Sequence, residues 1–400
     1  MASPIRGHPY SRLGSLTALV LGAIDRPTQW TRAADDAIVG YGRGGVAIVR
    51  SEGSPGMRVL VTGGTGYLGS HIVGALWREG HDVRVLARSP ERVAPALAPF
   101  GIDAAEVEAT VGDVLDRASM DAAVDGVDAM VNVANVYSLD IRDAERMHRV
   151  NRTGTEVALT AAVERGLSPI VHVSSYVALL PSSVPLTSAS PTGNPEGAYL
   201  ASKADSERIA FRLREQGAPV VVTNPGALFG PYDPHGGGST RFIRDRLVGR
   251  TAFSAPGSVP AVDVRDVARA HTRLVAYGTD QARFLMMGRR LALVERDAIL
   301  RRVTGRRLPA VPVPKAAMPS AGRVADALQR RGIDLGFSSM GTYTALQEPP
   351  VDDRDTQEAL GVRWRPLEDT CADMVAWLHA AGRIKAKQAG ALAGHVPAVT

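Results

Sequence analysis

The chain has 400 residues, and 45% of them are hydrophobic, which is enough to bury a large core. Its 46 Lys and Arg residues only slightly outnumber its 41 Asp and Glu residues, and the scattered arginines form no long basic block, which argues against a nucleic-acid partner. The single cysteine, Cys371, excludes an internal disulfide and a multi-cysteine metal site, and it fits a reducing, cytoplasmic compartment.

Residues 1–56 lack the periodic pattern that follows them, and they end in a linker-like run of turn residues at 51–56. We expect a poorly ordered N-terminal extension here. Its apolar stretch, residues 16–24, contains Thr17 and Gly22 and is too short to span a bilayer. Asp25 follows where a signal peptide would need small residues, so the sequence predicts neither export nor a membrane partner.

From Met57 onward, short apolar runs alternate with amphipathic helical patterns. The expected strands are 58–62, 82–87, 107–111, 128–133, 169–174 and 219–223, and the expected helices are 67–79, 116–124, 143–165 and 199–216. This alternation is typical of an α/β protein whose parallel sheet carries helices on both faces. We therefore expect a doubly wound Rossmann fold, with the dinucleotide-binding core at residues 57–230.

Beyond Gly226 the strict alternation ends. Glycines at 236–238 and several prolines mark loops, and a final helix is expected at 367–382. We expect residues 231–385 to form a smaller substrate-binding lobe, with 262–280 returning to the core, and residues 386–400 to form a flexible tail. In open α/β folds ligands lie beyond the carboxyl ends of the strands, where this lobe would cover them.

The first expected strand, 58–62, turns through glycines into a helix that begins near Tyr67. Gly63 permits the tight turn, Gly66 lets the backbone approach a pyrophosphate, and Gly69 lets the helix pack against the strand. The start of such a helix offers free N–H groups and a positive dipole end to phosphates. The motif predicts a dinucleotide site, although a tight turn without a ligand can have the same glycines.

The end of the second strand bears on the choice of cofactor. NAD-preferring sites place Asp or Glu there to bind the ribose 2′-hydroxyl, whereas this strand is followed by Arg88 and Ser89. A cation without a carboxylate suits a 2′-phosphate, so the sequence favours NADP over NAD. Arg92 is a second candidate, and an exposed surface role remains open for both arginines.

Three side chains are candidates for proton transfer. Tyr199 and Lys203 are four residues apart on one helix face, where a positive charge would lower the phenol pKa from its usual value of about 10. Tyr199 could then exchange a proton with an alcohol or carbonyl, and Lys203 could also bind a ribose. Ser175, at a strand end, could hydrogen-bond the same substrate oxygen. Each of these residues can occur at such a position by chance, but the three side chains together at one edge of the sheet indicate an active site.

With these motifs the sequence resembles the extended short-chain dehydrogenase/reductase family, also called the NAD-dependent epimerase/dehydratase family, and within it the dihydroflavonol-reductase-like branch. The resemblance covers roughly residues 57–382 and implies a doubly wound seven-stranded sheet with a small C-terminal lobe. The motifs that carry it follow in the expected order: 62–69, 112–114, 150–155, Ser174 with Ser175, Tyr199 with Lys203, 224–231 and 262–267.

The resemblance also implies roles for residues. Tyr199 is the catalytic acid/base, Lys203 lowers its pKa and binds the cofactor ribose, and Ser175, in preference to Ser174, orients the carbonyl. The implied cofactor-binding residues are Gly63, Thr65, Gly66, Tyr67, Leu68, Gly69, Arg88, Asp113, Val114, Val133, Ala134, Asn135, Tyr199, Lys203, Pro225 and Leu228. Two positions depart from the family pattern and bear on how the nicotinamide is positioned: residues 132–135 lack a frequent histidine, and Asn224 replaces a frequent arginine.

The sequence thus predicts an NADP-dependent oxidoreductase that interconverts a carbonyl and an alcohol on a small organic substrate. A nucleotide-sugar epimerase or dehydratase with bound NAD, a steroid-type 3-hydroxy dehydrogenase and a non-catalytic dinucleotide sensor are the alternatives. Homodimerisation is an expectation that comes from the family alone.

The sequence says less about the substrate and about metal binding. Phe229, Tyr232, Phe253 and Met286 suggest an apolar wall, but core packing explains them equally well. No metal is expected, because the histidines have no cysteine or carboxylate partners at the spacing of a metal site: His71, His148 and His172.

Overall fold

The computed structural model describes residues 31–33, 37–41, 47–51, 56–138, 141–251, 253–333 and 335–399. The chain divides into two units, Met1–Ser54 and Pro55–Thr400, and each has its own sheet. In the first unit β1 (Thr31–Ala33), β2 (Ala37–Tyr41) and β3 (Ala47–Ser51) pair antiparallel in that order. The extension predicted to be poorly ordered, 1–56, lies mostly outside the described residues. Its described part forms this sheet, whose valines and isoleucines favour strands.

The second unit is built around seven parallel strands: β4 (Arg58–Thr62), β5 (Asp82–Ala87), β6 (Glu108–Val111), β7 (Ala129–Asn132), β8 (Ile170–Val173), β9 (Val220–Pro225) and β13 (Arg283–Met286). They lie in the order β13-β9-β8-β7-β4-β5-β6. The chain moves outward from β4 through β5 to β6, and then returns to place β7 on the other side of β4. This reversal leaves a crevice beyond the carboxyl ends of β4 and β7, where open α/β folds bind ligands.

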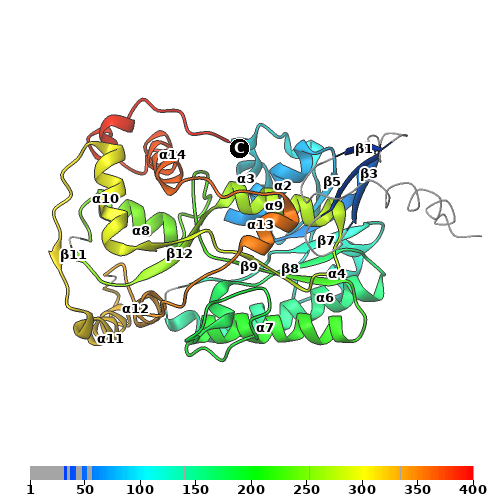
Figure 1. Ribbon diagram of the computed structural model, residues 1–400, viewed down its shortest axis with the longest axis horizontal. Helices are drawn as coiled ribbons and strands as arrows, with labels where there is room; N and C mark the ends of the chain where they lie inside the picture. The colour runs from blue at the N-terminus through cyan, green and yellow to red at the C-terminus, as the bar shows by residue number, and fades with distance from the viewer. Residues whose placement is uncertain are drawn as a thin grey trace, which may run out of the picture. The chain divides into compact units, whose positions relative to one another are not determined.

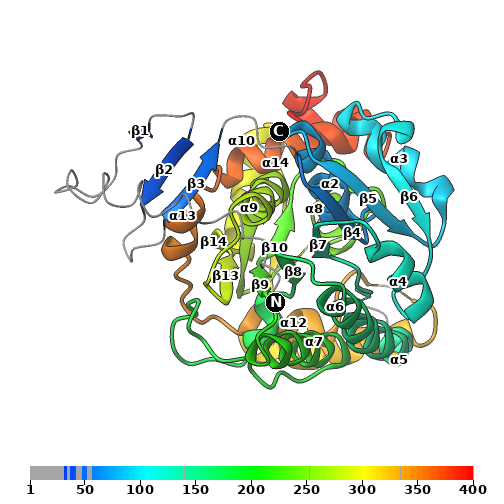
Figure 2. The same ribbon diagram turned by 90° about the vertical axis from the view of Figure 1, so that its right-hand side faces the viewer.

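Helices cover both faces of this sheet. One apolar core lies between the sheet and α2 (Tyr67–Arg78), α3 (Val93–Leu97) and α9 (Val264–Tyr277); the opposite core lies under α4 (Arg117–Val124), α6 (Gly154–Glu164) and α7 (Ala198–Glu215). Figure 2 shows α2 and α9 above the sheet and α6 and α7 below it. Apart from the edge strand β6, the strands are buried on both faces, which is why they read as continuous apolar runs. The predicted doubly wound α/β fold is confirmed.

The predicted strands and most predicted helices agree with the structure within two residues. The helix expected at 143–165 also begins and ends within one residue of these bounds, but it consists of α5 (Ala144–His148), a π-helical turn (Arg149–Thr153) and α6. Within the π-helical turn, the side chain of Asn151 binds the backbone at Val136.

The C-terminal lobe has a core of its own. Its helices are α8 (Gly238–Leu247), α10 (Leu293–Thr304), α11 (Met318–Gln329), α12 (Ser339–Leu346), α13 (Arg354–Leu360), α14 (Leu367–Ala380) and α15 (Ala386–Ala389). Its strands form two small sheets, β10 (Ala227–Phe229) with β12 (Ser258–Asp263) and β14 (Arg289–Ala292), and β11 (Phe253–Ser254) with β15 (Val311–Pro312). Figure 1 shows α8, α10, α11 and α12 on the side away from β5 and α4. Helix α9, within 262–280, packs against α2.

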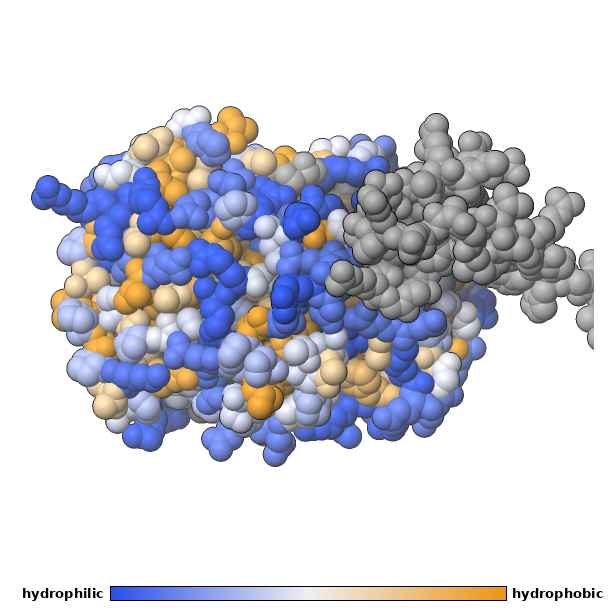
Figure 3. All heavy atoms as spheres, viewed as in Figure 1, coloured by the Kyte–Doolittle hydropathy of each residue, from blue (hydrophilic) through white to orange (hydrophobic). Residues whose placement is uncertain are grey.

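Short 3₁₀ helices complete the second unit at Pro90–Arg92, Ala98–Phe100, Ala104–Glu106, Ile141–Asp143, Tyr176–Leu179, Lys315–Ala317 and Gly390–Leu392. None of the helices in the described ranges is long and apolar enough to cross a bilayer. On the face drawn in Figure 3, hydrophilic and hydrophobic residues are interspersed.

The described part of the expected tail, residues 386–399, makes polar contacts with the rest of the second unit. Two of them span more than a hundred residues of sequence. The Tyr232 hydroxyl donates to the Pro397 carbonyl at 3.0 Å, and Arg265 Nη1 donates to the Ala398 carbonyl at 2.8 Å. His395 Nε2 lies 3.1 Å from Asp373 Oδ1. The composition of the tail suggested a mobile end, but its partners lie in distant segments.

Candidate active site

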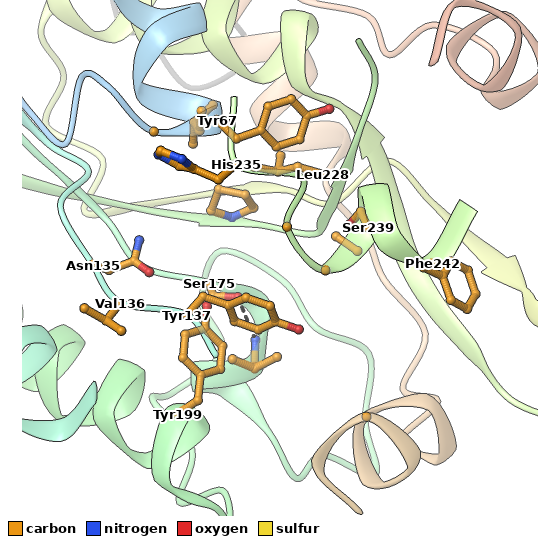
Figure 4. A pocket seen from close by; sticks show the side chains of 18 of the residues that line it. Tyr67, Asn135, Val136, Tyr137, Ser175, Tyr199, Leu228, His235, Ser239 and Phe242 are labelled. Atoms are coloured by element: carbon orange, nitrogen blue, oxygen red, sulfur yellow. Dashed lines mark hydrogen bonds between the residues drawn. The ribbon is translucent and has the colours of Figure 1, made fainter. Parts of the chain in front are cut away.

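A cavity of about 910 Å³ lies beyond the carboxyl ends of the central strands, between the sheet and the lobe. Its wall includes all but one of the residues predicted to catalyse the reaction or bind the cofactor: Gly63, Thr65, Gly66, Tyr67, Leu68, Gly69, Arg88, Asp113, Val114, Val133, Ala134, Asn135, Ser175, Tyr199, Pro225 and Leu228. The exception is Lys203, which is buried behind the wall. In Figure 4, Ser175 and Tyr199 lie across the cavity from Tyr67.

The glycine turn is built so that a helix start opens into this cavity. Gly63 has a φ of 69°, in the left-handed region that glycine favours, and its carbonyl accepts the Gly66 N–H at 2.9 Å. A Cβ on Gly69 would lie 2.1 Å from the Gly63 carbonyl oxygen, so only glycine fits there. No side chain caps the start of α2, which leaves its first N–H groups available to an anion.

The end of β5 presents cations. Arg88 and Arg92 are exposed and line the cavity, and neither side chain has a protein partner within the described part of the chain. No carboxylate stands directly after β5. The acid that follows β6, Asp113, lines the same end of the cavity and accepts the Leu115 N–H at 3.0 Å.

Ser175 and Tyr199 meet on the sheet side of the cavity. Ser175 is the second residue after the buried strand β8 and caps the 3₁₀ turn that follows it, while Tyr199 lies in the first turn of α7. Ser174 also lines the cavity, but it is the Ser175 side chain that lowers the pKa of the Tyr199 phenol. The Tyr199 ring is edge-on to Tyr137, with 4.8 Å between their centroids.

The acid–base properties of this pair differ from the expectation. Burial raises the pKa of Tyr199 above its usual value, the nearby Tyr137 raises it further, and the hydrogen bond with Ser175 opposes both. Lys203 was expected to lower this pKa, but its Nζ donates to the Val173 carbonyl at 2.8 Å and is directed toward β8. Burial also lowers the pKa of Lys203 itself to about 8, against the opposing charge of Glu207.

Asn151 holds the active-site helix in place, a role that the sequence reasoning missed. Its Oδ1 accepts the Val136 N–H at 2.7 Å, and its Nδ2 donates to the Val136 carbonyl and to the Ser202 Oγ, both at 3.0 Å. Its own carbonyl accepts the Ser206 hydroxyl at 2.7 Å. The segment after β7 is thereby tied to α7 beside Tyr199. The motif at 150–155 contained this signal, but a sequence alone does not show where the amide binds.

The two departures from the family pattern have defined partners. Asn132 Oδ1 accepts the Thr62 hydroxyl at 2.6 Å, and its Nδ2 lies 3.2 Å from His172 Nδ1, which links the ends of β4, β7 and β8. Asn224 Nδ2 donates to the Ser175 carbonyl at 3.0 Å and to Glu207 Oε2 at 2.6 Å. Both asparagines therefore support the strand ends that present the catalytic candidates.

The lobe side of the cavity was only partly anticipated. Phe229 and Phe253 line the cavity, whereas Met286 is buried in the sheet and Tyr232 packs against other aromatic rings. Sequence reasoning missed further lining residues from loops and lobe helices: Tyr137, His235, Phe242, Arg296, Phe337 and Met340. Within the described ranges no three His, Cys, Asp or Glu side chains gather in a group that could hold a metal.

The sheet, the glycine turn and the adjoining cavity define a dinucleotide-binding α/β enzyme of the Rossmann type. Comparison with known families specifies it further: the NAD dependent epimerase/dehydratase family matches residues 59–284, more than half of the chain, and the chain belongs to this family. This confirms the predicted family and enzyme class, an NAD(P)-dependent oxidoreductase of the extended short-chain dehydrogenase/reductase type.

Three similar proteins illustrate the range of the family. Sterol demethylase protein B of Methylococcus capsulatus is 29% identical over 82% of this chain and its own full length. A putative dihydroflavonol 4-reductase of Synechocystis is 28% identical over 82% of this chain and 96% of its own. The crystal structure of DesIV, a dTDP-glucose 4,6-dehydratase from Streptomyces venezuelae with NAD and TYD bound, is 26% identical with a TM-score of 0.63, over 81% of this chain and 97% of its own.

Proposed function

We propose that this protein is an NADP-dependent oxidoreductase that interconverts a carbonyl and an alcohol on a small organic substrate. The observation that carries the proposal is that Ser175 and Tyr199 lie together on the wall of a cavity that also contains the glycine turn. Lys203 lies one helical turn along α7 from Tyr199. The three side chains act together as the catalytic group.

The residues around the cavity fit a dinucleotide. The contact between Gly69 and the Gly63 carbonyl leaves no room for a side chain, so the uncapped start of α2 stays open to a pyrophosphate. Asp113 would contact the adenosine end, and Pro225 and Leu228 would flank the nicotinamide. When bound, the cofactor supplies or accepts a hydride.

Two residues of the chain would bind the substrate oxygen and exchange a proton with it. The Ser175 hydroxyl would hydrogen-bond this oxygen and fix its position, and Tyr199 would exchange a proton with it. The phenol of Tyr199 is protonated at neutral pH, as an unperturbed tyrosine already is, and burial raises its pKa further, so the residue is present as the acid. This state suits reduction, in which negative charge develops on the oxygen and must be quenched by a proton. To bind the ribose, Lys203 would have to turn its ammonium group from the Val173 carbonyl toward the cavity, which would also bring a positive charge to the phenol.

The preference for NADP rests on the cations at the end of β5. Arg88 and Arg92 reach the cavity without protein partners in the described ranges, and a 2′-phosphate would supply the missing anion. A hydrogen bond to a charged group contributes about 1.5–3 kcal/mol. The Arg88→Ala variant should therefore bind NADPH about 10- to 150-fold more weakly, with little change for NADH, as measured by cofactor fluorescence titration. Equal losses for both cofactors would contradict the assignment.

The activity itself is tested with purified full-length protein, NADPH and a panel of ketones and aldehydes, followed by loss of NADPH absorbance. Tyr199→Phe keeps the ring and its contact with Tyr137 but removes the proton. We expect kcat to fall by about 10²- to 10⁴-fold, the usual contribution of a general acid, while the NADPH Kd stays unchanged. Full turnover in this variant would refute the proposal.

The second candidate is a nucleotide-sugar epimerase or dehydratase with bound NAD, favoured by the similarity to the DesIV dehydratase. Such an enzyme would retain stoichiometric NAD through purification and would act on a nucleotide sugar without added cofactor. A non-catalytic dinucleotide sensor would bind the cofactor but turn over neither class of substrate. The presence of Tyr199 and Lys203 favours an enzyme.

Two further expectations belong to this proposal. Homodimerisation would pair outer helices of two copies, and α6 and α7 are joined at their surface by an Arg212–Glu156 ion pair of 2.9 Å, so such an interface would be polar. Light scattering of the purified protein measures the oligomeric state. A cytoplasmic location fits a chain whose single cysteine, Cys371, is buried and unable to form an internal disulfide.

A further inference from the structure

We infer that the lobe side of the cavity is a substrate chamber for a bulky, apolar carbonyl compound that carries no phosphate. This inference rests on the proposed function and specifies its substrate class. It concerns the half of the cavity formed by α8, α10, α11, α12 and the short strands between them.

The wall of this chamber is apolar and comes from many separate elements. Aromatic and aliphatic side chains face it from helices and loops spread over about a hundred residues of the lobe: Phe242, Phe253, Leu293, Met318, Phe337 and Met340. The Phe253 and Phe337 rings meet edge to face, with 5.4 Å between their centroids. Apolar side chains gathered around an open space, and not only around one another, indicate a binding surface for apolar groups.

The charged groups on this side of the cavity are already bonded to other groups of the protein. The Asp233 carboxylate accepts the N–H groups of Gly236 and Gly237 at 3.0 and 2.7 Å and the Thr240 hydroxyl at 2.6 Å. The Arg296 guanidinium is 2.7 Å from Asp297 Oδ1 and lies 4.1 Å from the centre of the Phe242 ring. A diphosphate placed here would find no uncommitted guanidinium or ammonium group on the described lobe wall, because Arg88 and Arg92 lie at the other end, after β5.

The chamber lies next to the proton donor. Figure 4 shows Tyr137 beside Tyr199, and Ser239 and Phe242 further along the same opening. Tyr137 spans toward the start of α8, where a Cβ on Gly238 would be only 2.9 Å from its Cε1. A carbonyl held at Ser175 and Tyr199 would therefore project the rest of its molecule between this tyrosine and the apolar wall.

The first test varies the substrate and needs no mutation. Burial of one methylene contributes about 0.8 kcal/mol, which is about fourfold in an equilibrium or rate constant. In a series of unbranched methyl ketones, kcat/KM with NADPH should rise about fourfold for each added methylene until the chamber is filled. A value that stays flat along the series overturns the inference.

The second test places a charge in the chamber. Ala321 and Val324 lie one turn apart on α11, but Ala321 lines the cavity while Val324 is 57% exposed. Ala321→Arg should lower kcat/KM for the longest ketones at least tenfold and spare the shortest, whereas Val324→Arg should change neither. Equal unfolding midpoints and equal NADPH affinity show that both variants are folded. Unchanged discrimination in a folded Ala321→Arg protein contradicts the assignment.

A binding measurement separates the chamber from the reaction and remains usable if Ala321→Arg does not fold. Nile red is an uncharged apolar probe, and long methyl ketones should displace it from wild-type protein while dTDP-glucose should not. Displacement without any NADPH consumption would support the chamber and refute the proposed reductase. NADPH-dependent reduction without chain-length preference would uphold the reductase and overturn the chamber. Displacement by dTDP-glucose alone would overturn the chamber and favour the epimerase or dehydratase.

Discussion

Arg283, at the start of β13, neutralises a carboxylate buried between the sheet and α7. Glu207 has no exposed surface and Arg283 only 5%, and the two form an ion pair. The same carboxylate accepts the Thr192 hydroxyl at 2.8 Å and Asn224 Nδ2 at 2.6 Å. The guanidinium also lies over the Phe211 ring, 4.6 Å from its centre. Every polar neighbour of Glu207 thus depends on its being charged and paired.

The Arg283→Met variant keeps an apolar stem against Phe211 but removes the cation that contacts the Glu207 carboxylate, so only the more distant charge of Lys203 remains. Removing one partner of a buried pair costs about 3–5 kcal/mol, because the remaining charge is uncompensated. The free energy of unfolding should fall by this amount. The double variant Arg283→Met/Glu207→Gln should recover most of the loss, since a neutral amide needs no counter-charge and can still bond to Thr192.

Urea denaturation followed by tryptophan fluorescence measures these differences. The matched control is Arg208→Met on the same helix as Glu207: Arg208 pairs with Asp205, but its side chain is 45% exposed, so we expect a loss of at most about 1 kcal/mol. A loss below about 1 kcal/mol in Arg283→Met, or a double variant no more stable than the single one, would refute this account of the buried charge.

Two other predictions concern the glycine turn and the buried lysine. The Gly69→Ala substitution puts a Cβ atom 2.1 Å from the Gly63 carbonyl oxygen, an overpacking that costs about 1–3 kcal/mol. NADPH binding, measured by fluorescence titration, should therefore weaken about 5- to 150-fold. The control variant Gly394→Ala, at a position with open space around it, should bind NADPH as the wild type does. The pKa of Lys203 is lowered by burial to about 8 from 10.5, so between these pH values the unfolded chain binds more protons and stability rises with pH. Between pH 8 and 10.5 the free energy of unfolding of the wild type should therefore rise by up to about 3 kcal/mol relative to that of the Lys203→Met variant. A difference that stays constant or falls over this pH range would contradict the prediction.

The parts of the fold that could be predicted are those fixed by neighbouring residues. Strands β4 and β5 were predicted with the bounds that the structure has, because each is a short run of apolar residues ended by a turn. The glycine turn could also be interpreted locally, since only five residues lie between Gly63 and Gly69. Arg88 lines the cavity because it directly follows such a strand.

The parts that were missed depend on partners far along the chain. Arg265 binds Asp373 and the Ala398 carbonyl, 108 and 133 residues away, and these contacts hold a tail whose composition suggested mobility. Lys203 faces the Val173 carbonyl because of how α7 lies on β8, which its spacing from Tyr199 could not show. Tyr137 and the chamber wall come from loops and lobe helices whose shared cavity exists only after folding.

The apolar chamber and the raised pKa of Tyr199 have one physical cause. Apolar side chains around the phenol remove water, which penalises the phenolate and keeps the proton on Tyr199. The same removal of water makes the chamber favourable to an apolar substrate, whose entry would exclude still more solvent and strengthen the bond from Ser175 to the substrate oxygen. Proton donation leaves a phenolate, which the same removal of water penalises. In the proposed reaction, a bulkier substrate should therefore lower KM, and it should raise kcat only as far as the stronger bond from Ser175 to the charge developing on the oxygen outweighs this penalty. A polar substrate of equal length would gain neither effect, so the difference in kcat between the two measures the coupling directly.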